Sequence, residues 1–84
     1  MIPPGWIERR GGLERTYRFG SFREAWAFMS RVAALAEAAD HHPDWRNSYG
    51  RVDIRLTTHE AGRITERDVA LARRINETTE EDAE

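Results

Sequence analysis

The chain has 84 residues, 39% of them hydrophobic, and its 13 basic and 15 acidic residues give a formal net charge of -2 at pH 7. This length and composition suit one compact domain, and the mixed charges form no basic stripe, which argues against binding to a nucleic-acid backbone. The absence of cysteine excludes disulfides and thiolate metal sites, so any catalysis must use histidine, carboxylate, hydroxyl or arginine groups.

The N-terminal stretch MIPPGWIERR lacks the cationic-then-apolar order of a secretory signal. No apolar run in the chain approaches the roughly 20 residues that a membrane-spanning helix needs. We therefore expect a cytoplasmic protein that does not contact a membrane.

The first predicted element is a β-hairpin. Two segments with strand character, at 6–9 and 13–19, flank Gly11-Gly12, and two glycines supply the positive backbone angles of a two-residue turn. In the register that this turn predicts, Trp6 faces Tyr17 across the ladder as an aromatic pair.

A helix is predicted next, over about residues 22–39. It starts near Phe22 because Ser21 and Glu24 have the spacing of a capping box. It must end before Pro43, because proline forces the preceding residue into an extended conformation and has no amide donor.

The apolar surface of this helix is wide and divides into two stripes. One holds Phe22, Trp26, Met29, Ala33 and Ala36, and the other holds Phe28, Val32, Leu35 and Ala39. If one stripe covers a sheet, the second needs another partner. We favour subunit association through Phe28, Val32 and Leu35 over simple excess coverage of the core.

A second hairpin and a second helix complete the domain. Residues 45–49 and 51–57 flank Gly50, and apolar and polar residues alternate along the second segment at the strand period. Thr65 and Asp68 predict the start of an amphipathic helix that ends near Asn76. The acidic tail, residues 78–84, has almost nothing to bury, so we expect it to be mobile.

Histidines and carboxylates are predicted to meet at one end of the second hairpin. Extending its pairing from a turn at Tyr49 and Gly50 places Asp40 or His41 opposite His59. Asp68, in the first turn of the last predicted helix, is a further candidate because the helix dipole favours a carboxylate there. One pocket could hold all of these groups.

Two other interpretations stay open. His41 and His42 precede Pro43 and can simply bind free carbonyls at a helix end, and His59 can be an ordinary surface residue. Three histidines and an aspartate could also bind zinc, but no HExxH or similar spacing is present, so we expect no metal.

A set of spaced residues runs through the chain: Glu37, His41-His42-Pro43, Tyr49, His59 and Asp68, with GW at 5–6, YRFGSFREAWAFMSRVA at 17–33 and THEAGRITERD at 58–68. Together they resemble the signature of the pterin-4a-carbinolamine dehydratases over about residues 5–77. Members of that family commonly carry a further helix before the Gly-Trp pair, where this chain has only MIPP. This departure bears on oligomeric assembly more than on chemistry.

The resemblance implies a single α+β domain, here residues 1–77, with a four-stranded antiparallel sheet, helices packed on one face and the order β-β-α-β-β-α. It implies an enzyme, a hydro-lyase, that dehydrates 4a-hydroxytetrahydropterin to quinonoid dihydropterin. This reaction completes the cofactor cycle of aromatic amino-acid hydroxylases, and no metal or organic cofactor is implied.

The resemblance also implies a set of site residues: His41, His42 and His59 as catalytic groups, and Asp40, Thr57, Thr58, Glu60 and Asp68 around the pterin. Our hypothesis makes His42 and His41 the acid/base pair and His59 the group that orients the pterin. Asp68 fixes a histidine tautomer or closes the pocket. Trp45 could stack on the pterin, but we favour a core position for it.

A non-enzymatic interpretation is kept as the alternative. Some relatives of the family act as dimerisation partners for transcription factors, through the helix that otherwise builds their own oligomer. The wide apolar helix of residues 22–39 suits such a role, and also a homo-oligomer, dimer or tetramer. We place the enzyme first because a pure binding module has no reason to keep histidines grouped.

Overall fold

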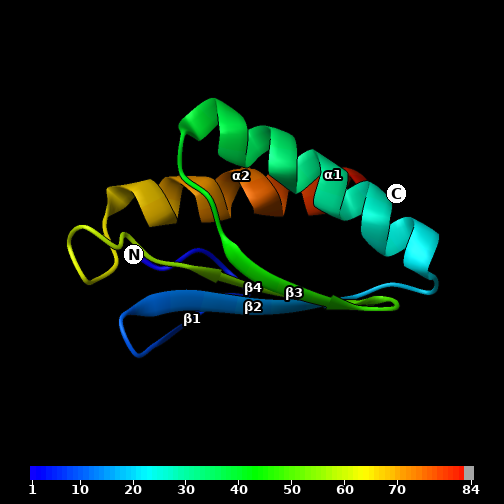
Figure 1. The fold of residues 1–84 in the computed structure, drawn as a ribbon, viewed down its shortest axis with the longest axis horizontal. Helices are drawn as coiled ribbons and strands as arrows, with labels where there is room; N and C mark the ends of the chain where they lie inside the picture. The colour runs from blue at the N-terminus through cyan, green and yellow to red at the C-terminus, as the bar shows by residue number, and fades with distance from the viewer. Residues whose placement is uncertain (83–84) are drawn as a thin grey trace.

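Residues 1–82 of the chain are described by the structure, a computed structural model. Within them the elements follow the order β1 (Ile7–Arg9), β2 (Gly12–Arg18), α1 (Phe22–Ala39), β3 (Asp44–Ser48), β4 (Arg51–Leu56) and α2 (Glu66–Asp82). These strands form a four-stranded antiparallel sheet in the order β1-β2-β4-β3, and both helices cover the same face of it (Figure 1). The predicted α+β fold is therefore confirmed. No helix in residues 1–82 is long and apolar enough to cross a membrane.

The second hairpin has the predicted turn and register. Trp45 pairs with Ile54, and Tyr49 adopts a positive φ of 54° at the turn. Gly50 is required there because a Cβ atom on it would lie 2.2 Å from the carbonyl oxygen of Phe19. The two backbones are this close because the Phe19 amide donates to the Gly50 carbonyl. Trp45 is partly buried and packs against the hydrophobic core, as the sequence interpretation favoured.

The first hairpin differs from its predicted register. The turn lies at Arg10 and Gly11, with φ of 53° and 77°, and Gly12 already belongs to β2, so Trp6 does not face Tyr17. The reason is packing, because a Cβ atom on Gly12 would lie 2.5 Å from the guanidinium carbon of Arg55. This guanidinium donates to the backbone carbonyls of Arg9 and Arg10. Gly12 is therefore used for close approach, and an arginine supplies the first positive angle.

Trp6 packs against α2 and bonds to it. Its indole nitrogen donates to Oδ1 of Asn76 at 2.9 Å, and the Arg15 guanidinium donates to the same oxygen at 2.7 Å. The Asn76 amide donates in turn to the carbonyl of Pro4 at 3.0 Å. Tyr17 lies beside this cluster, and burial raises the pKa of its hydroxyl. The N-terminal segment is thereby fixed to the last helix.

The predicted end of the last helix near Asn76 is wrong, because α2 runs to Asp82. Asparagine weakens a helix chiefly when its side chain competes for local backbone groups. Here that side chain is engaged by residues far away in the sequence. Residues 83 and 84 of the predicted mobile tail lie outside the described part of the chain, and the mobility of residues 78–84 stays a prediction.

Both ends of α1 follow the sequence signals. Ser21 is the N-cap and its hydroxyl accepts from the Glu24 amide at 3.2 Å, while the Glu24 carboxylate accepts from the Gly20 amide. Asp40 ends the helix in the left-handed conformation, with φ of 51°, three residues before Pro43. This turn directs the chain away from the helix and toward the sheet.

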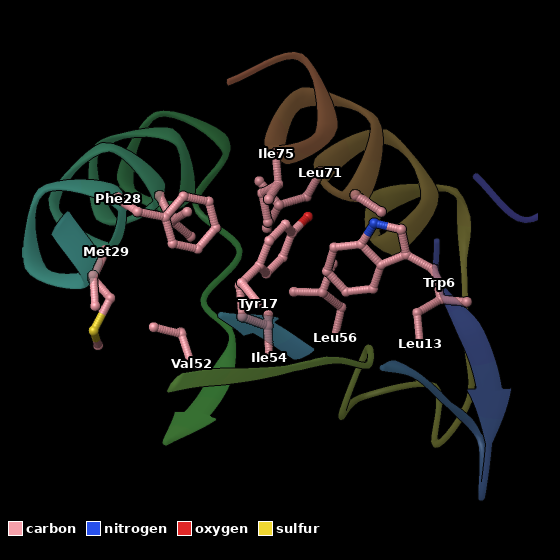
Figure 2. Packing of buried hydrophobic residues seen from close by; sticks show 13 residues of the cluster. Trp6, Leu13, Tyr17, Phe28, Met29, Val52, Ile54, Leu56, Leu71 and Ile75 are labelled. Atoms are coloured by element: carbon pink, nitrogen blue, oxygen red, sulfur yellow. The ribbon is translucent and has the colours of Figure 1, made fainter. Parts of the chain in front are cut away.

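The buried face of α1 corrects the predicted subunit stripe. Phe28 and Val32 are completely buried within one chain, so these two side chains do not form a subunit interface. Leu35 is partly buried and packs against the same core. Figure 2 shows Phe28 directed toward Ile75 of α2 and Met29 directed toward the sheet. The helix packs against both the sheet and α2, and it therefore buries part of each apolar stripe. The remaining apolar side chains of the two stripes are exposed.

The two faces of α1 predict different costs for removing an aromatic ring. Phe28→Ala should lower the free energy of unfolding by about 3 to 5 kcal/mol, because it leaves a cavity in the core. Phe22→Ala, on the half-exposed flank of the same helix, should change it by about 0.5 kcal/mol or less in dilute solution. Urea denaturation followed by circular dichroism measures both. If both variants lose the same free energy of unfolding, the assignment of Phe28 to the buried face and Phe22 to the exposed flank is wrong.

Candidate active site

Four chain segments meet at one end of the sheet. Because β3 and β4 are antiparallel and Asp44 pairs with Arg55, the start of β3 and the end of β4 lie at the same end. The exit of α1 leads into β3 there, and the loop after β4 leads into α2 (Figure 1, left side). The predicted extension of the ladder to Asp40, His41 and His59 is wrong, because β3 begins only at Asp44, after Pro43.

His41 is the most buried of the three histidines, with 7% of its side chain exposed. Its backbone amide donates to the carbonyl of Ala36, which completes the end of α1 after the left-handed Asp40. This fixed backbone directs the ring inward, where Nε2 lies 2.6 Å from Oδ1 of Asp68. A buried carboxylate thus holds the ring in one orientation.

Asp68 is fully buried and lies in the first turn of α2. Its second oxygen, Oδ2, accepts from the hydroxyl of Thr58 and from the backbone amide of Thr65, both at 2.8 Å. The bond to Thr65 is the carboxylate half of a capping box, as the TERD sequence predicted. The same side chain therefore starts α2 and contacts His41.

His42 and His59 are exposed, and each has a carboxylate of its own. Nε2 of His42 lies 2.7 Å from Oε2 of Glu37, and Nε2 of His59 lies 3.5 Å from Oδ2 of Asp44. The His42 and His59 side chains are 55% and 73% exposed, so both rings are accessible to a ligand. Among residues 1–82, no three histidine or carboxylate side chains are grouped so that they could hold a metal ion.

The remaining predicted site residues occupy different surroundings. Asp40 and Glu60 are exposed at the surface. Thr57 is half-buried and its hydroxyl donates to the carbonyl of Gly11 at 2.9 Å, so it ties the site to the first hairpin. Thr58 is buried and its hydroxyl is taken up by Asp68 and Thr65.

Sequence reasoning did not assign three contacts of the site. Thr65 was read only as a helix cap, yet its hydroxyl lies 2.6 Å from that of Thr58. The contact of Asp44 with His59 and the bond from the Arg67 guanidinium to the Asp40 carbonyl at 2.8 Å have no counterpart among the sequence predictions. Strand alternation beyond Leu56 places Thr58 on the buried face, so the inward direction of this predicted site residue could have been read from the sequence.

Two hollows lie near these groups. A cavity of about 270 Å³ between α1 and α2 has an apolar lining that includes Leu35 and Leu71, and it reaches His41. A shallower hollow of about 440 Å³ lies on the sheet around Asp44 and Arg46. Of these two hollows, the first is lined in part by a histidine of the candidate site and the second is not.

Comparison with known proteins identifies the family of this chain. A family model described as pterin 4 alpha carbinolamine dehydratase matches residues 1–78. A protein of Thermomicrobium roseum named "Putative pterin-4-alpha-carbinolamine dehydratase" is 61% identical over 74 residues, which cover 88% of this chain and 80% of the relative.

Two solved structures are similar in fold. The crystal structure of a transcriptional coactivator/pterin dehydratase from Brucella melitensis has a TM-score of 0.81 at 41% identity, covering 87% of this chain and 80% of that one. A pterin dehydratase-like protein identified as a RuBisCO assembly factor in the alpha-carboxysome has a TM-score of 0.68 at 27% identity, covering 83% and 81%. From the family model and the close relative together, we conclude that the chain belongs to the pterin-4-alpha-carbinolamine dehydratase family.

Proposed function

We propose that this protein dehydrates 4a-hydroxytetrahydropterin to quinonoid dihydropterin and water, in the cytoplasm, and so recycles the pterin cofactor of aromatic amino-acid hydroxylases. The observation that carries the proposal is the pairing of His41, His42 and His59 with separate carboxylates at one end of the sheet. Family membership supplies the substrate class.

The reaction needs two proton transfers at neighbouring atoms. The bond between C4a and its hydroxyl breaks and the oxygen leaves as water with a proton from an acid. N5 gives its proton to a base as the double bond between C4a and N5 forms. Imidazole performs either role near neutral pH. In our proposal His42 and His41 are the acid/base pair, and His59 contacts and orients the pterin.

The carboxylates support these roles to different degrees. Asp68 is fully buried, so it acts on the substrate through His41 and not by touching the pterin. Glu37 and Asp44 are exposed and adjust the orientation of His42 and His59. Asp40, Thr57 and Glu60 are proposed to line the pterin pocket, since Asp40 and Glu60 are exposed and Thr57 lies in the same loop region.

A homo-oligomer, dimer or tetramer, is part of the proposal, with a different surface from the one expected at first. Phe22 and Trp26 stack on each other at 6.4 Å between ring centroids, and their side chains are 52% and 56% exposed. Contiguous exposed apolar side chains on a soluble protein can serve as an association surface. We therefore assign subunit contact to this flank of α1.

The second candidate function is a protein-binding module without catalysis. The two solved structures are described as a transcriptional coactivator/pterin dehydratase and as a RuBisCO assembly factor, which supports protein-partner roles on this fold. The exposed Phe22 and Trp26 would also suit such a partner. The enzyme is preferred because binding through α1 gives no reason for three histidine–carboxylate pairs at the far end of that helix.

Removal of the proposed proton-transfer partner tests the enzyme assignment. His42→Ala should lower turnover by about 100-fold to 10,000-fold with the fold intact, the usual contribution of a general acid or base. His59→Ala should mainly raise KM, because a group that only positions the ring acts equally on ground state and transition state. Stopped-flow dehydration of freshly generated 4a-hydroxytetrahydropterin, beside circular dichroism, measures both.

The outcome that contradicts the site assignment is specific. If a folded His41→Ala/His42→Ala double variant dehydrates the pterin at the wild-type rate, histidine catalysis is wrong. The protein-binding role would then become the better explanation.

Turnover should not depend on a metal ion. The proposed route needs imidazole lone pairs that exchange protons, and a bound cation would occupy them. Treatment with a chelator, followed by the same stopped-flow assay, should leave the rate unchanged. A loss of activity that zinc alone restores would contradict the proposal.

The exposed aromatic pair predicts how assembly responds to mutation. Trp26→Glu should convert the oligomer into a monomer without changing the circular dichroism spectrum, because it places a charge on an apolar contact. Light scattering at micromolar concentration measures the mass. Arg23→Glu, which changes charge beside the pair without removing an aromatic ring, serves as the control. If the wild-type protein is a monomer at this concentration, the assignment of this flank to subunit contact is wrong.

A further inference from the structure

A chain of hydrogen bonds extends from His41 past Asp68 into the loop before α2. The hydroxyl of Thr58 lies 2.8 Å from Oδ2 of Asp68 and 2.6 Å from the hydroxyl of Thr65. Thr58 is 5% exposed and Asp68 is fully buried. These hydroxyls therefore bond to each other and to the carboxylate in the interior.

The direction of each bond in this chain is determined by proton counting. A threonine hydroxyl carries one proton, and a carboxylate only accepts. The Thr58 proton therefore goes to Asp68, and Thr65 must donate its own proton to Thr58. The oxygen of Thr65 remains free to accept from the backbone amide of Arg67 at 3.3 Å. All the donors point toward the carboxylate.

The carboxylate at the end of this chain sets the tautomer of His41, and the two threonines hold that carboxylate in place. Oδ2 of Asp68 already accepts from the Thr58 hydroxyl and the Thr65 amide, and Oδ1 faces Nε2 of His41 at 2.6 Å. An acceptor at this position requires that Nε2 carry the hydrogen. In the neutral ring the other nitrogen, Nδ1, then carries the lone pair.

We propose that Thr58 and Thr65 are positioning residues which, through Asp68, make Nδ1 of His41 the atom that takes the proton from N5 of the pterin. His41 is thereby the base, and Asp68 stabilises the imidazolium formed when Nδ1 accepts the proton. The catalytic part of this inference rests on the proposed function, whereas the tautomer does not depend on it.

The same geometry changes the role of Thr58. The family resemblance places this residue among those that line the pterin pocket. Its hydroxyl is buried and its single proton goes to Asp68, so it could donate to a ligand only if that bond were broken. Thr58 therefore acts on the reaction through Asp68 and His41.

A variant that removes the Thr58 hydroxyl but keeps the shape of the side chain tests the proposal. In Thr58→Val, kcat should fall roughly tenfold to 100-fold, the effect of losing a group that orients a metal-ligating histidine, with KM changed about twofold or less. Thr58→Ser retains the hydroxyl and should restore most of kcat. Should Thr58→Val not fold, Thr58→Ala removes the same group, and circular dichroism checks each variant.

Nitrogen-15 NMR of labelled histidine provides a readout that a loss of packing alone would not produce. In the wild-type protein with neutral His41, Nε2 should resonate as a protonated nitrogen and Nδ1 as an unprotonated one. In Thr58→Val the two should move toward the averaged values of a tautomer mixture. Thr65→Val should have the same effect, and Thr65→Ser should not.

Thr16→Val is a matched control on the sheet. The Thr16 hydroxyl also donates to an aspartate, Oδ1 of Asp53, at 2.7 Å, but at an exposed position. Its removal should leave kcat and the His41 resonances unchanged.

The possible failures are distinguishable. An inactive wild-type protein whose His41 is protonated at Nε2 would overturn the proposed function and leave the tautomer assignment standing. An active wild-type protein with Nδ1 protonated, or a folded Thr58→Val variant with unchanged kcat and unchanged resonances, would overturn this inference alone.

Discussion

The carboxylate of Asp68 is the interaction on which the candidate site depends. A fully buried charge is costly unless hydrogen bonds compensate it, and this one is bonded to His41, Thr58 and Thr65. These partners come from the exit of α1, the segment after β4 and the start of α2. Two connections of the fold, α1–β3 and β4–α2, are therefore joined at one side chain, and movement of either one removes part of the hydrogen bonding that compensates the buried carboxylate.

This arrangement explains why the histidines differ in burial. His41 lies against Asp68 in the interior, where its ring has a single orientation, while His42 and His59 are held at the surface by exposed carboxylates. Exposed ion pairs are weak because water and salt screen them. The site thus combines one rigid imidazole with two rings that can adjust to a ligand.

The sequence predicted the parts of this structure that depend on local signals. The capping residues Ser21 and Thr65, the stop before Pro43 and the apolar alternation along β4 act within a few residues, so they could be read without a structure. The pairing of β3 with β4 followed from hairpin geometry, although the ladder stops at Asp44 and does not reach the histidines. The connectivity of this hairpin indicated the end of the sheet where the candidate site lies.

The errors arose where distant segments decide the outcome. Gly12 belongs to β2 and not to the turn because Arg55 packs on it, and Phe28 is buried because α2 lies beside α1. Neither neighbour is adjacent in sequence. Strand alternation indicates the inward direction of Thr58, but its bond to Asp68 could not be predicted, since that partner is ten residues away on another element.

The bond between Trp6 and Asn76 has a consequence for how the chain folds. It joins residues 70 positions apart, so its formation closes almost the entire chain into a loop. Closing a long loop costs entropy, and contacts of large sequence separation slow folding compared with local ones. The β3–β4 hairpin and the two helices can form from neighbouring residues, whereas β1 and the N-terminal segment gain this anchor only once α2 is in place. The contact between the two ends of the chain is thus expected to form late in folding, and it lies away from the histidines.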